Sequence, residues 1–271
     1  MSGNSLYSNQ RMLKESLKEA LLKAGLYYKI NDYRFRHREW GGLREASQKA
    51  FYATLIGRDD LVFDVGANVG QRAQIFSQLC RQVVAIEPQA QCVRHLRSRF
   101  KFSKNVSIEQ LALGEREGEA VLRESDSHTI SSMSARFIEA VGKARFKGSN
   151  WERAVTVEVK TLDQLIVKYG LPKFIKIDVE GYEAEVLAGL NSAVPYLSFE
   201  FTPELMDEAE RCVARLDKIS EGYLYNYCLG ENLEFVLESH ATGALMSAKI
   251  LPELARQGNF GDLYAIHQSG T

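Results

Sequence analysis

A glycine-rich turn directly after an apolar run is the most specific local feature of this sequence. Residues 61–65 are typical of a short buried strand, and Asp64 lies near its end. Gly66, Asn68 and Gly70 follow and open a helical pattern. We expect Gly66 to allow a tight turn with close approach of the backbone to a ligand, and Gly70 to let the helix pack against the sheet. The loop therefore predicts a ligand site beyond the carboxyl end of this strand.

The charges around this loop indicate which ligand it takes. The spacing is not G-x-G-x-x-G, because Asn68 stands at the middle position, and Asp64 would repel a pyrophosphate but suit an amino group. Glu87, followed by Pro88, comes 21 residues after Gly66, where an acid can hydrogen-bond both hydroxyls of a ribose. An adenosine ligand with an ammonium or sulfonium and no pyrophosphate is S-adenosylmethionine, which we predict as the cofactor. A glycine turn without a ligand and an NAD-dependent oxidoreductase are the alternatives, and the spacing disfavours the second.

A dense charge cluster ends another apolar run, residues 173–178. In a strand, Lys176 and Asp178 share one face, whereas Ile175 and Ile177 share the other. Charged groups at the carboxyl end of a central strand face the ligand crevice, and a carboxylate there can take a proton or bind a metal ion. A structural ion pair between Lys176 and an acid is the alternative interpretation.

Short apolar runs alternate with helical patterns over most of the chain. We expect strands at 61–65, 83–86, 106–111, 173–178 and 196–201, and helices at 70–80, 90–100, 184–190 and 204–218. Residues 115–160 interrupt the alternation with expected strands at 119–123 and 155–159 and a helix at 134–147. Short strands are expected near 223–228, 233–237 and 262–266. The alternation predicts an α/β domain with a mostly parallel central sheet and helices on both faces.

The first part of the chain has a different pattern. Leucines within residues 11–25 have helical spacing, and residues 26–42 are rich in Tyr, Arg and His. We interpret the second segment as packing, although its aromatic and basic residues could also contact an anionic or sugar-like ligand. We therefore divide the chain into an N-terminal helical extension, residues 1–57, and a main domain, residues 58–271.

Six motifs occur in an order that is found in one known family. They are residues 62–70, Ala85-Ile86-Glu87-Pro88, Ala112-Leu113-Gly114, Val159-Lys160-Thr161-Leu162-Asp163, residues 175–183 and Leu187-Ala188-Gly189. Over residues 58–201 the sequence resembles the FkbM family of S-adenosylmethionine-dependent methyltransferases. The resemblance implies a Rossmann-like class I methyltransferase fold. It also implies O-methylation of a hydroxyl on a sugar, a glycan precursor or another small molecule, without naming the acceptor.

The resemblance further implies roles for individual residues. The cofactor loop would consist of Asp64, Gly66, Asn68 and Gly70. The ribose would be held by Glu87 with Pro88 beside it, and Ala112 would lie by the adenine. Ser131 and Ser132 match a serine pair that often precedes the mobile part of such domains, although Ser-rich loops are common without a function.

Methyl transfer to a hydroxyl requires an aligned acceptor oxygen and removal of its proton. We predict Asp178 and Glu180 as the catalytic carboxylates, with Asp178 first because it lies at the strand end, and Glu183 and Glu200 next. These acids could equally hold Mg²⁺ through oxygen ligands, and the sequence does not separate a metal ligand from a general base. Among the histidines, only His128 is a candidate base. A binding module of the same fold without catalysis is the alternative function.

Composition disfavours several other classes of protein. The 271 residues carry 34 Lys+Arg and 35 Asp+Glu, a net charge of −1, so no global basic surface for nucleic acid is expected. No stretch reaches 18 apolar residues and the N-terminus lacks a secretory signal, from which we predict a cytoplasmic protein without a transmembrane helix. The four cysteines form no C-x-x-C pair and are expected to be reduced and buried. The sequence carries no readable sign of the acceptor or the oligomeric state.

Overall fold

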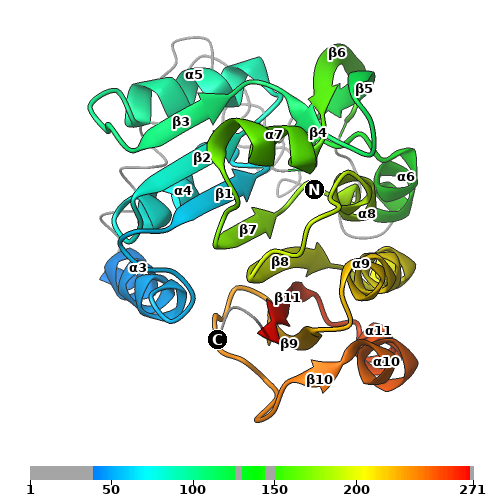
Figure 1. Cartoon of the computed structure of the whole chain (residues 1–271). Coiled ribbons are helices and arrows are strands. Elements are labelled where there is room, and N and C mark those ends of the chain that lie inside the picture. The colour runs from blue at the N-terminus through cyan, green and yellow to red at the C-terminus, as the bar shows by residue number, and fades with distance from the viewer. Residues whose placement is uncertain (1–38, 126–129, 144–149, 269–271) are drawn as a thin grey trace, which may run out of the picture. The chain divides into compact units, whose positions relative to one another are not determined.

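The structure is a computed structural model that describes residues 39–125, 130–143 and 150–268 (Figure 1). The chain divides into two compact units, Met1–Gln48 and Lys49–Thr271. Helix α3 (Glu39–Tyr52) runs across this division. The second unit holds every element described below.

Some predictions fall on parts of the chain that the structure does not describe. The helix expected within residues 11–25 and the candidate base His128 lie outside the described residues, as does most of the segment 26–42. The domain boundary between residues 57 and 58 stays a prediction.

An eight-stranded sheet forms the centre of the second unit. Its strands are β1 (Leu61–Val65), β2 (Gln82–Ile86), β3 (Val106–Glu109), β7 (Phe174–Ile177), β8 (Tyr196–Phe201), β9 (Tyr223–Leu229), β10 (Ala241–Thr242) and β11 (Gly261–His267). Their order across the sheet is β10-β9-β11-β8-β7-β1-β2-β3. The neighbours from β8 to β3 are parallel, and β11 is antiparallel to both β8 and β9. The chain order reverses between β1 and β7, which is the kind of switch point where open α/β sheets bind ligands.

Helices cover both faces of this sheet (Figure 1). On one face, which we call the α4 face, the end of α3 packs together with α4 (Gln71–Ser77) and α5 (Ala90–Arg99). On the other face, the α9 face, lie α7 (Leu162–Tyr169), α8 (Glu183–Ala188), α9 (Met206–Ile219) and α11 (Leu251–Gln257). This mostly parallel sheet between two helical layers confirms the predicted Rossmann-like class I methyltransferase fold.

The interruption expected at residues 115–160 forms a second sheet of three strands. Its order is β4 (Ala112–Leu113), β6 (Arg153–Lys160) and β5 (Gly118–Glu124). The strand predicted at 106–111 is present as β3, which ends at Glu109, and β4 follows it and pairs with β6 in this second sheet. Helix α6 (Ala135–Lys143) corresponds to the helix expected at 134–147.

The predicted strand at 233–237 is wrong. Asn226 on β9 binds the backbone of this segment, because its Nδ2 donates to the carbonyl of Leu237 at 2.8 Å and its Oδ1 accepts from the N–H of Leu237 at 3.0 Å. Phe235 packs edge-on against Tyr264, with 5.3 Å between the ring centroids. The apolar run is therefore a packed loop, and the chain continues through β10, α10 (Gly243–Leu245), a π-helical turn (Met246–Ile250) and α11.

Two predictions from composition can be compared with the structure. The four cysteines, Cys80, Cys92, Cys212 and Cys228, are free and buried, as expected. In the part of the chain that the structure describes, no helix combines the length and the apolar character that crossing a membrane needs.

Gly70 allows close packing between two helices of the α4 face. It has φ 80° and precedes α4, and a Cβ atom there would lie 2.7 Å from Leu96 on α5 and 2.8 Å from Phe100 directly after α5. The sequence predicts that Gly70 lets the helix pack against the sheet. In the structure, the side of Gly70 where a Cβ atom would stand faces α5 instead.

We expect Gly70→Ala to lower the free energy of unfolding by about 2–4 kcal/mol, because it combines left-handed strain with overpacking. Denaturant unfolding measures this change, provided that the dependence of the free energy of unfolding on denaturant concentration is the same in both proteins. Gly57→Ala is the matched control, since its Cβ would meet no atom closer than 3.6 Å, and it should shift the value by less than about 0.5 kcal/mol. Equal effects of the two substitutions would contradict the packing role.

Candidate functional site

The strand register brings polar side chains into one row on the α4 face of the sheet. Asp64 on β1 is the neighbour of Lys176 on β7, and Lys176 is the neighbour of Ser198 on β8. Laterally paired residues share a face, and all three side chains are buried. Ile175 and Ile177 lie in the core of the opposite face. The predicted separation of polar and apolar side chains along this strand is confirmed.

The loop after β1 contacts the backbone of the turn after β7. Gly66 has φ 78°, and a side chain at this position would overlap the carbonyl oxygen of Asp178. Asn68 also has a left-handed backbone, with φ 51°, and its N–H donates to Glu87 Oε2 at 2.8 Å. The loop is thus fixed on one side by β7 and on the other by the acid that ends β2.

Both carboxylate oxygens of Glu87 are already engaged by the backbone. Oε2 accepts from the N–H of Asn68 and Oε1 accepts from the N–H of Gln89, each at 2.8 Å. Burial raises the pKa of Glu87 to about 7, although these two amides act in the opposite direction. The side chain of Gln89 also bonds to Glu87, and a carboxylate accepts about four hydrogen bonds, so Glu87 keeps acceptor capacity for about one hydroxyl.

Asp64 carries a buried acceptor that the structure leaves without a partner. Its side chain is 2% exposed, and Oδ2 makes no hydrogen bond. Burial raises the pKa of Asp64 to about 6, and the nearby ammonium of Lys176 lowers it in part. A buried carboxylate oxygen without a donor is costly, and a cationic ligand group at this position would satisfy it.

An ion pair between a buried lysine and a more exposed aspartate joins the row of polar side chains to the turn after β7. Lys176 Nζ lies 2.6 Å from Asp178 Oδ2, and the lysine side chain is 3% exposed whereas that of Asp178 is 41% exposed. Burial alone would lower the pKa of Lys176, but the carboxylates of Asp178 and Asp262 raise it above its ordinary value. The ion pair of the alternative interpretation therefore exists, and it holds Asp178 at the solvent-facing end of the strand.

Three carboxylates gather at this end of the sheet. Oxygens of Asp178, Glu180 and Glu200 all lie within 4.8 Å of one another, and all three residues are half-buried. Burial and the charges of Glu180 and Asp178 raise the pKa of Glu200 well above its ordinary value. Glu200 therefore holds its proton more tightly than a free glutamate does. Such a group could share a proton or hold a divalent cation.

Glu183, predicted as a further acid of this cluster, has a different place. It is 2% exposed, and its Oε1 accepts from the N–H of Val179 at 3.1 Å and from the N–H of Gly181 at 3.2 Å. Burial raises the pKa of Glu183 to about 8. The side chain therefore stabilises residues 178–183, which we call the catalytic turn after its two predicted catalytic carboxylates, and it is absent from the group of three carboxylates.

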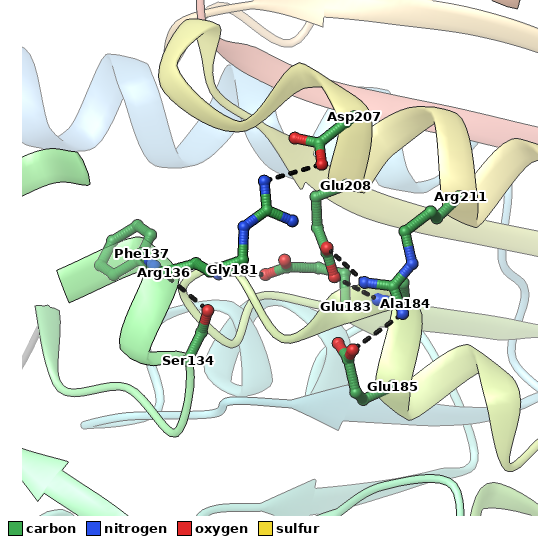
Figure 2. Close-up of polar contacts among 10 residues, drawn as sticks. All are labelled: Ser134, Arg136, Phe137, Gly181, Glu183, Ala184, Glu185, Asp207, Glu208 and Arg211. Atoms are coloured by element: carbon green, nitrogen blue, oxygen red, sulfur yellow. Dashed lines mark hydrogen bonds and ion pairs between the residues drawn. The ribbon is translucent and has the colours of Figure 1, made fainter. Parts of the chain in front are cut away.

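Figure 2 shows the polar contacts of α9 with the start of α8 and with α6. Glu208 on α9 accepts from the N–H of Ala184 at 3.1 Å and pairs with Arg211 at 2.8 Å. Arg136 on α6 and Asp207 on α9 form an ion pair at 2.8 Å. The contact of Glu208 fixes the start of α8, and the ion pair of Arg136 joins α6 to α9.

The remaining predicted site residues are Pro88 and Ala112. Pro88 is half-buried directly after Glu87, and Ala112 is buried at the start of β4. Sequence reasoning missed Gln89, whose side-chain oxygen accepts from Ser131 Oγ at 3.0 Å. No spacing pattern signals this contact, because 42 residues separate the two.

A model of the FkbM methyltransferase domain matches residues 64–227, which is more than half of the chain. A search of curated proteins gave no match. Among solved structures, the FkbM methyltransferase from Methylobacillus flagellatus KT is similar with 16% identity and a TM-score of 0.48, over 79% of this chain and 47% of that one. This chain therefore spans about half the length of that protein.

Two further solved structures are similar at lower identity. One is the precorrin-6y C5,15-methyltransferase from Geobacter metallireducens GS-15, with 11% identity and a TM-score of 0.44 over 83% of this chain and 89% of that one. The other is fibrillarin from Aeropyrum pernix, whose structure contains natively bound S-adenosyl-L-methionine. It has 10% identity and a TM-score of 0.41 over 82% of this chain and 76% of that one.

The raised pKa of Glu183 predicts a falling stability with rising pH. Between its ordinary value of 4.5 and about 8, the folded protein binds this proton more tightly than the unfolded chain does. The free energy of unfolding therefore falls as pH rises through this window, by up to about 1.4 kcal/mol per pH unit for one proton. Glu183→Gln keeps an oxygen acceptor for both amides and cannot titrate, so it should reduce that slope by about 1 kcal/mol per pH unit.

Denaturant unfolding at pH 6, 7 and 8 measures the slope. Glu119→Gln on β5 is the control, because this glutamate is exposed and should leave the slope unchanged. A wild-type slope in Glu183→Gln would contradict the assignment.

Proposed function

This chain belongs to the FkbM methyltransferase family, and we propose that it transfers the methyl group of S-adenosylmethionine to a hydroxyl of a small-molecule or saccharide acceptor. The observation that carries the proposal is the contact between the loop after β1 and the catalytic turn. It brings the buried acids Asp64 and Glu87 and the carboxylates of the turn to one edge of the sheet. Acids that suit a cationic adenosine ligand thus lie next to acids that suit proton transfer.

The residues present fit the proposed cofactor. Asp64 Oδ2, which is buried and unpartnered, would accept from the ammonium of the methionine part. Glu87 would accept from a ribose hydroxyl with the capacity that its bonds to Asn68 and Gln89 leave. Gly66 keeps the loop free of a side chain at its contact with the turn. When bound, S-adenosylmethionine supplies a methyl group on a positively charged sulfur.

The residues of the catalytic turn would handle the proton of the acceptor. Asp178 is our general base, because its carboxylate is more exposed than Lys176 beside it and lies at the end of β7. Lys176 would hold the orientation of that carboxylate through the 2.6 Å ion pair. Glu180 would contact the acceptor hydroxyl from the same turn, and Glu200 would carry a proton beside both.

A metal-assisted version of this chemistry rests on the same three carboxylates. Oxygen ligands at this spacing suit Mg²⁺, which would acidify the acceptor hydroxyl. Lys176 already supplies one positive charge to Asp178, and this weakens the attraction of the three carboxylates for a metal ion.

Wild-type protein should bind S-adenosylhomocysteine, the demethylated cofactor, with micromolar affinity in a calorimetric titration. Glu87→Ala should abolish measurable binding, because it removes both the ribose acceptor and the anchor of Asn68. Glu119→Ala, an exposed glutamate on β5, is the control and should bind like wild type. Failure of the wild type to bind either the cofactor or its product would contradict the proposal.

Asp178→Asn should reduce methyl transfer from labelled cofactor to a panel of hydroxylated acceptors by at least about 100-fold, while the affinity for S-adenosylhomocysteine changes by less than about three-fold. Asp59→Asn, an exposed acid in the turn before β1, is the matched control. A chelator should leave the wild-type rate unchanged, and a rate restored only by added Mg²⁺ would overturn the base assignment. Cofactor binding without turnover on every acceptor would instead favour a non-catalytic binding module.

A further inference from the structure

Two adjacent serines each bind a different half of the candidate site. Ser131 Oγ donates to Gln89 Oε1 at 3.0 Å, and Ser132 Oγ donates to the carbonyl oxygen of Glu180 at 2.6 Å. Both serines are buried, with exposed fractions of 8% and 1%. One hydroxyl of this segment thus binds the residue next to the proposed ribose acid, and the next hydroxyl binds the catalytic turn.

On the cofactor side, the bond leads to the proposed ribose acid. The N–H of Gln89 donates to Glu87 Oε1 at 2.8 Å, so Ser131 fixes the residue that orients this carboxylate. Ser131 Oγ also accepts from the N–H of Ser125 at 3.0 Å. The hydroxyl is therefore held between β5 and the loop after β2, and it has no freedom to turn away.

On the catalytic side, the bond holds a strained residue. Glu180 has φ 56°, a left-handed conformation that costs a non-glycine residue about 1–2 kcal/mol, and Gly181 follows with φ 81°. Such a conformation persists only where its surroundings hold it in place. Ser132 binds the carbonyl of this residue, while Glu183 binds the amides on either side of it.

The segment that carries both serines is itself anchored. The backbone of Ser132 exchanges two hydrogen bonds with Arg123 on β5, at 3.0 and 3.1 Å. Trp151 Nε1 donates to the carbonyl oxygen of Ile130 at 2.7 Å. One peptide unit therefore separates the hydroxyl that binds Gln89 from the hydroxyl that binds Glu180, so a shift of either serine moves the other.

We infer that Ser131 and Ser132 form a clasp that couples the proposed ribose acid to the catalytic turn. Ser131 is a positioning residue for Glu87, acting through Gln89, and Ser132 is a positioning residue for Glu180. Cofactor held by Glu87 orders the clasp, and the clasp orders the turn. This inference rests on the proposed function for the identity of the ligand, whereas the two serine contacts do not.

Hydrogen exchange of the full chain, read by mass spectrometry with and without S-adenosylhomocysteine, tests the clasp. In wild type, the ligand should slow exchange both in the peptide around Glu87 and in the peptide around the catalytic turn. Ser132→Ala should speed exchange of the turn about five- to ten-fold, as expected for the loss of one hydrogen bond, and should remove its protection by the ligand. Its affinity for S-adenosylhomocysteine should stay within about two-fold of wild type.

Ser131→Ala should show the reverse pattern. We expect an affinity about five- to ten-fold weaker and faster exchange around Glu87, with little change in the turn of the ligand-free protein. Ser103→Ala is the matched control, because Ser103 is exposed and lies in the turn after α5, outside the segment that carries the two serines. It should leave both measurements at wild-type values. Exchange of β9 and β11 reports whether each variant is folded.

Three results would overturn the clasp. They are equal effects of the two serine variants on both peptides, no effect of either, and a wild-type protein that binds the ligand without any protection of the turn. If wild type binds no S-adenosylhomocysteine, the proposed function fails, and the clasp is then decided by the ligand-free exchange of the two variants. In the ligand-free protein, faster exchange around Glu87 only in Ser131→Ala and in the catalytic turn only in Ser132→Ala supports the clasp. Faster exchange of both peptides in both variants refutes it.

Discussion

The carbonyl oxygen of Asp178 occupies the space where residue 66 would carry a side chain. This one backbone contact joins the loop after β1 to the turn after β7, across the point where the chain order of the sheet reverses. Everything described at the site depends on it, because the loop leads through Asn68 to Glu87 and the turn carries Asp178 and Glu180. The two halves of the site therefore cannot separate without breaking the centre of the fold.

Burial of acids is the second constraint, and it follows from the first. Loops that pack this closely remove water from the carboxylates between them, and burial raises the pKa values of Asp64, Glu87 and Glu183 to about 6, 7 and 8. The charged forms of these acids are stabilised mainly by backbone amides and by Lys176. A proton and a positively charged ligand group thus compete for the carboxylates, which suits a site for a sulfonium or an ammonium.

The sequence predicted the position of a residue best where a local rule, such as the alternation of side chains along a strand, determines it. Strand alternation was sufficient to separate Lys176 from Ile175 and Ile177, and the apolar run followed by Gly66 located the loop. It was least informative where a contact joins distant residues. The carboxylate of Glu183 looked like its neighbours Asp178 and Glu180, and only the fold shows that it binds the amides of their turn. The apolar residues 233–237 looked like a strand, because the side chain of Asn226 that satisfies their backbone lies on another element.

The left-handed backbone of Glu180 has a consequence for engineering this protein. A glycine or an asparagine at this position would relieve the strain, so selection for heat resistance alone favours replacing the glutamate. The replacement would also remove one of the three clustered carboxylates. Thermostability and the proposed chemistry thus place opposite demands on the same residue, and a thermostable variant is best sought by leaving the catalytic turn unchanged.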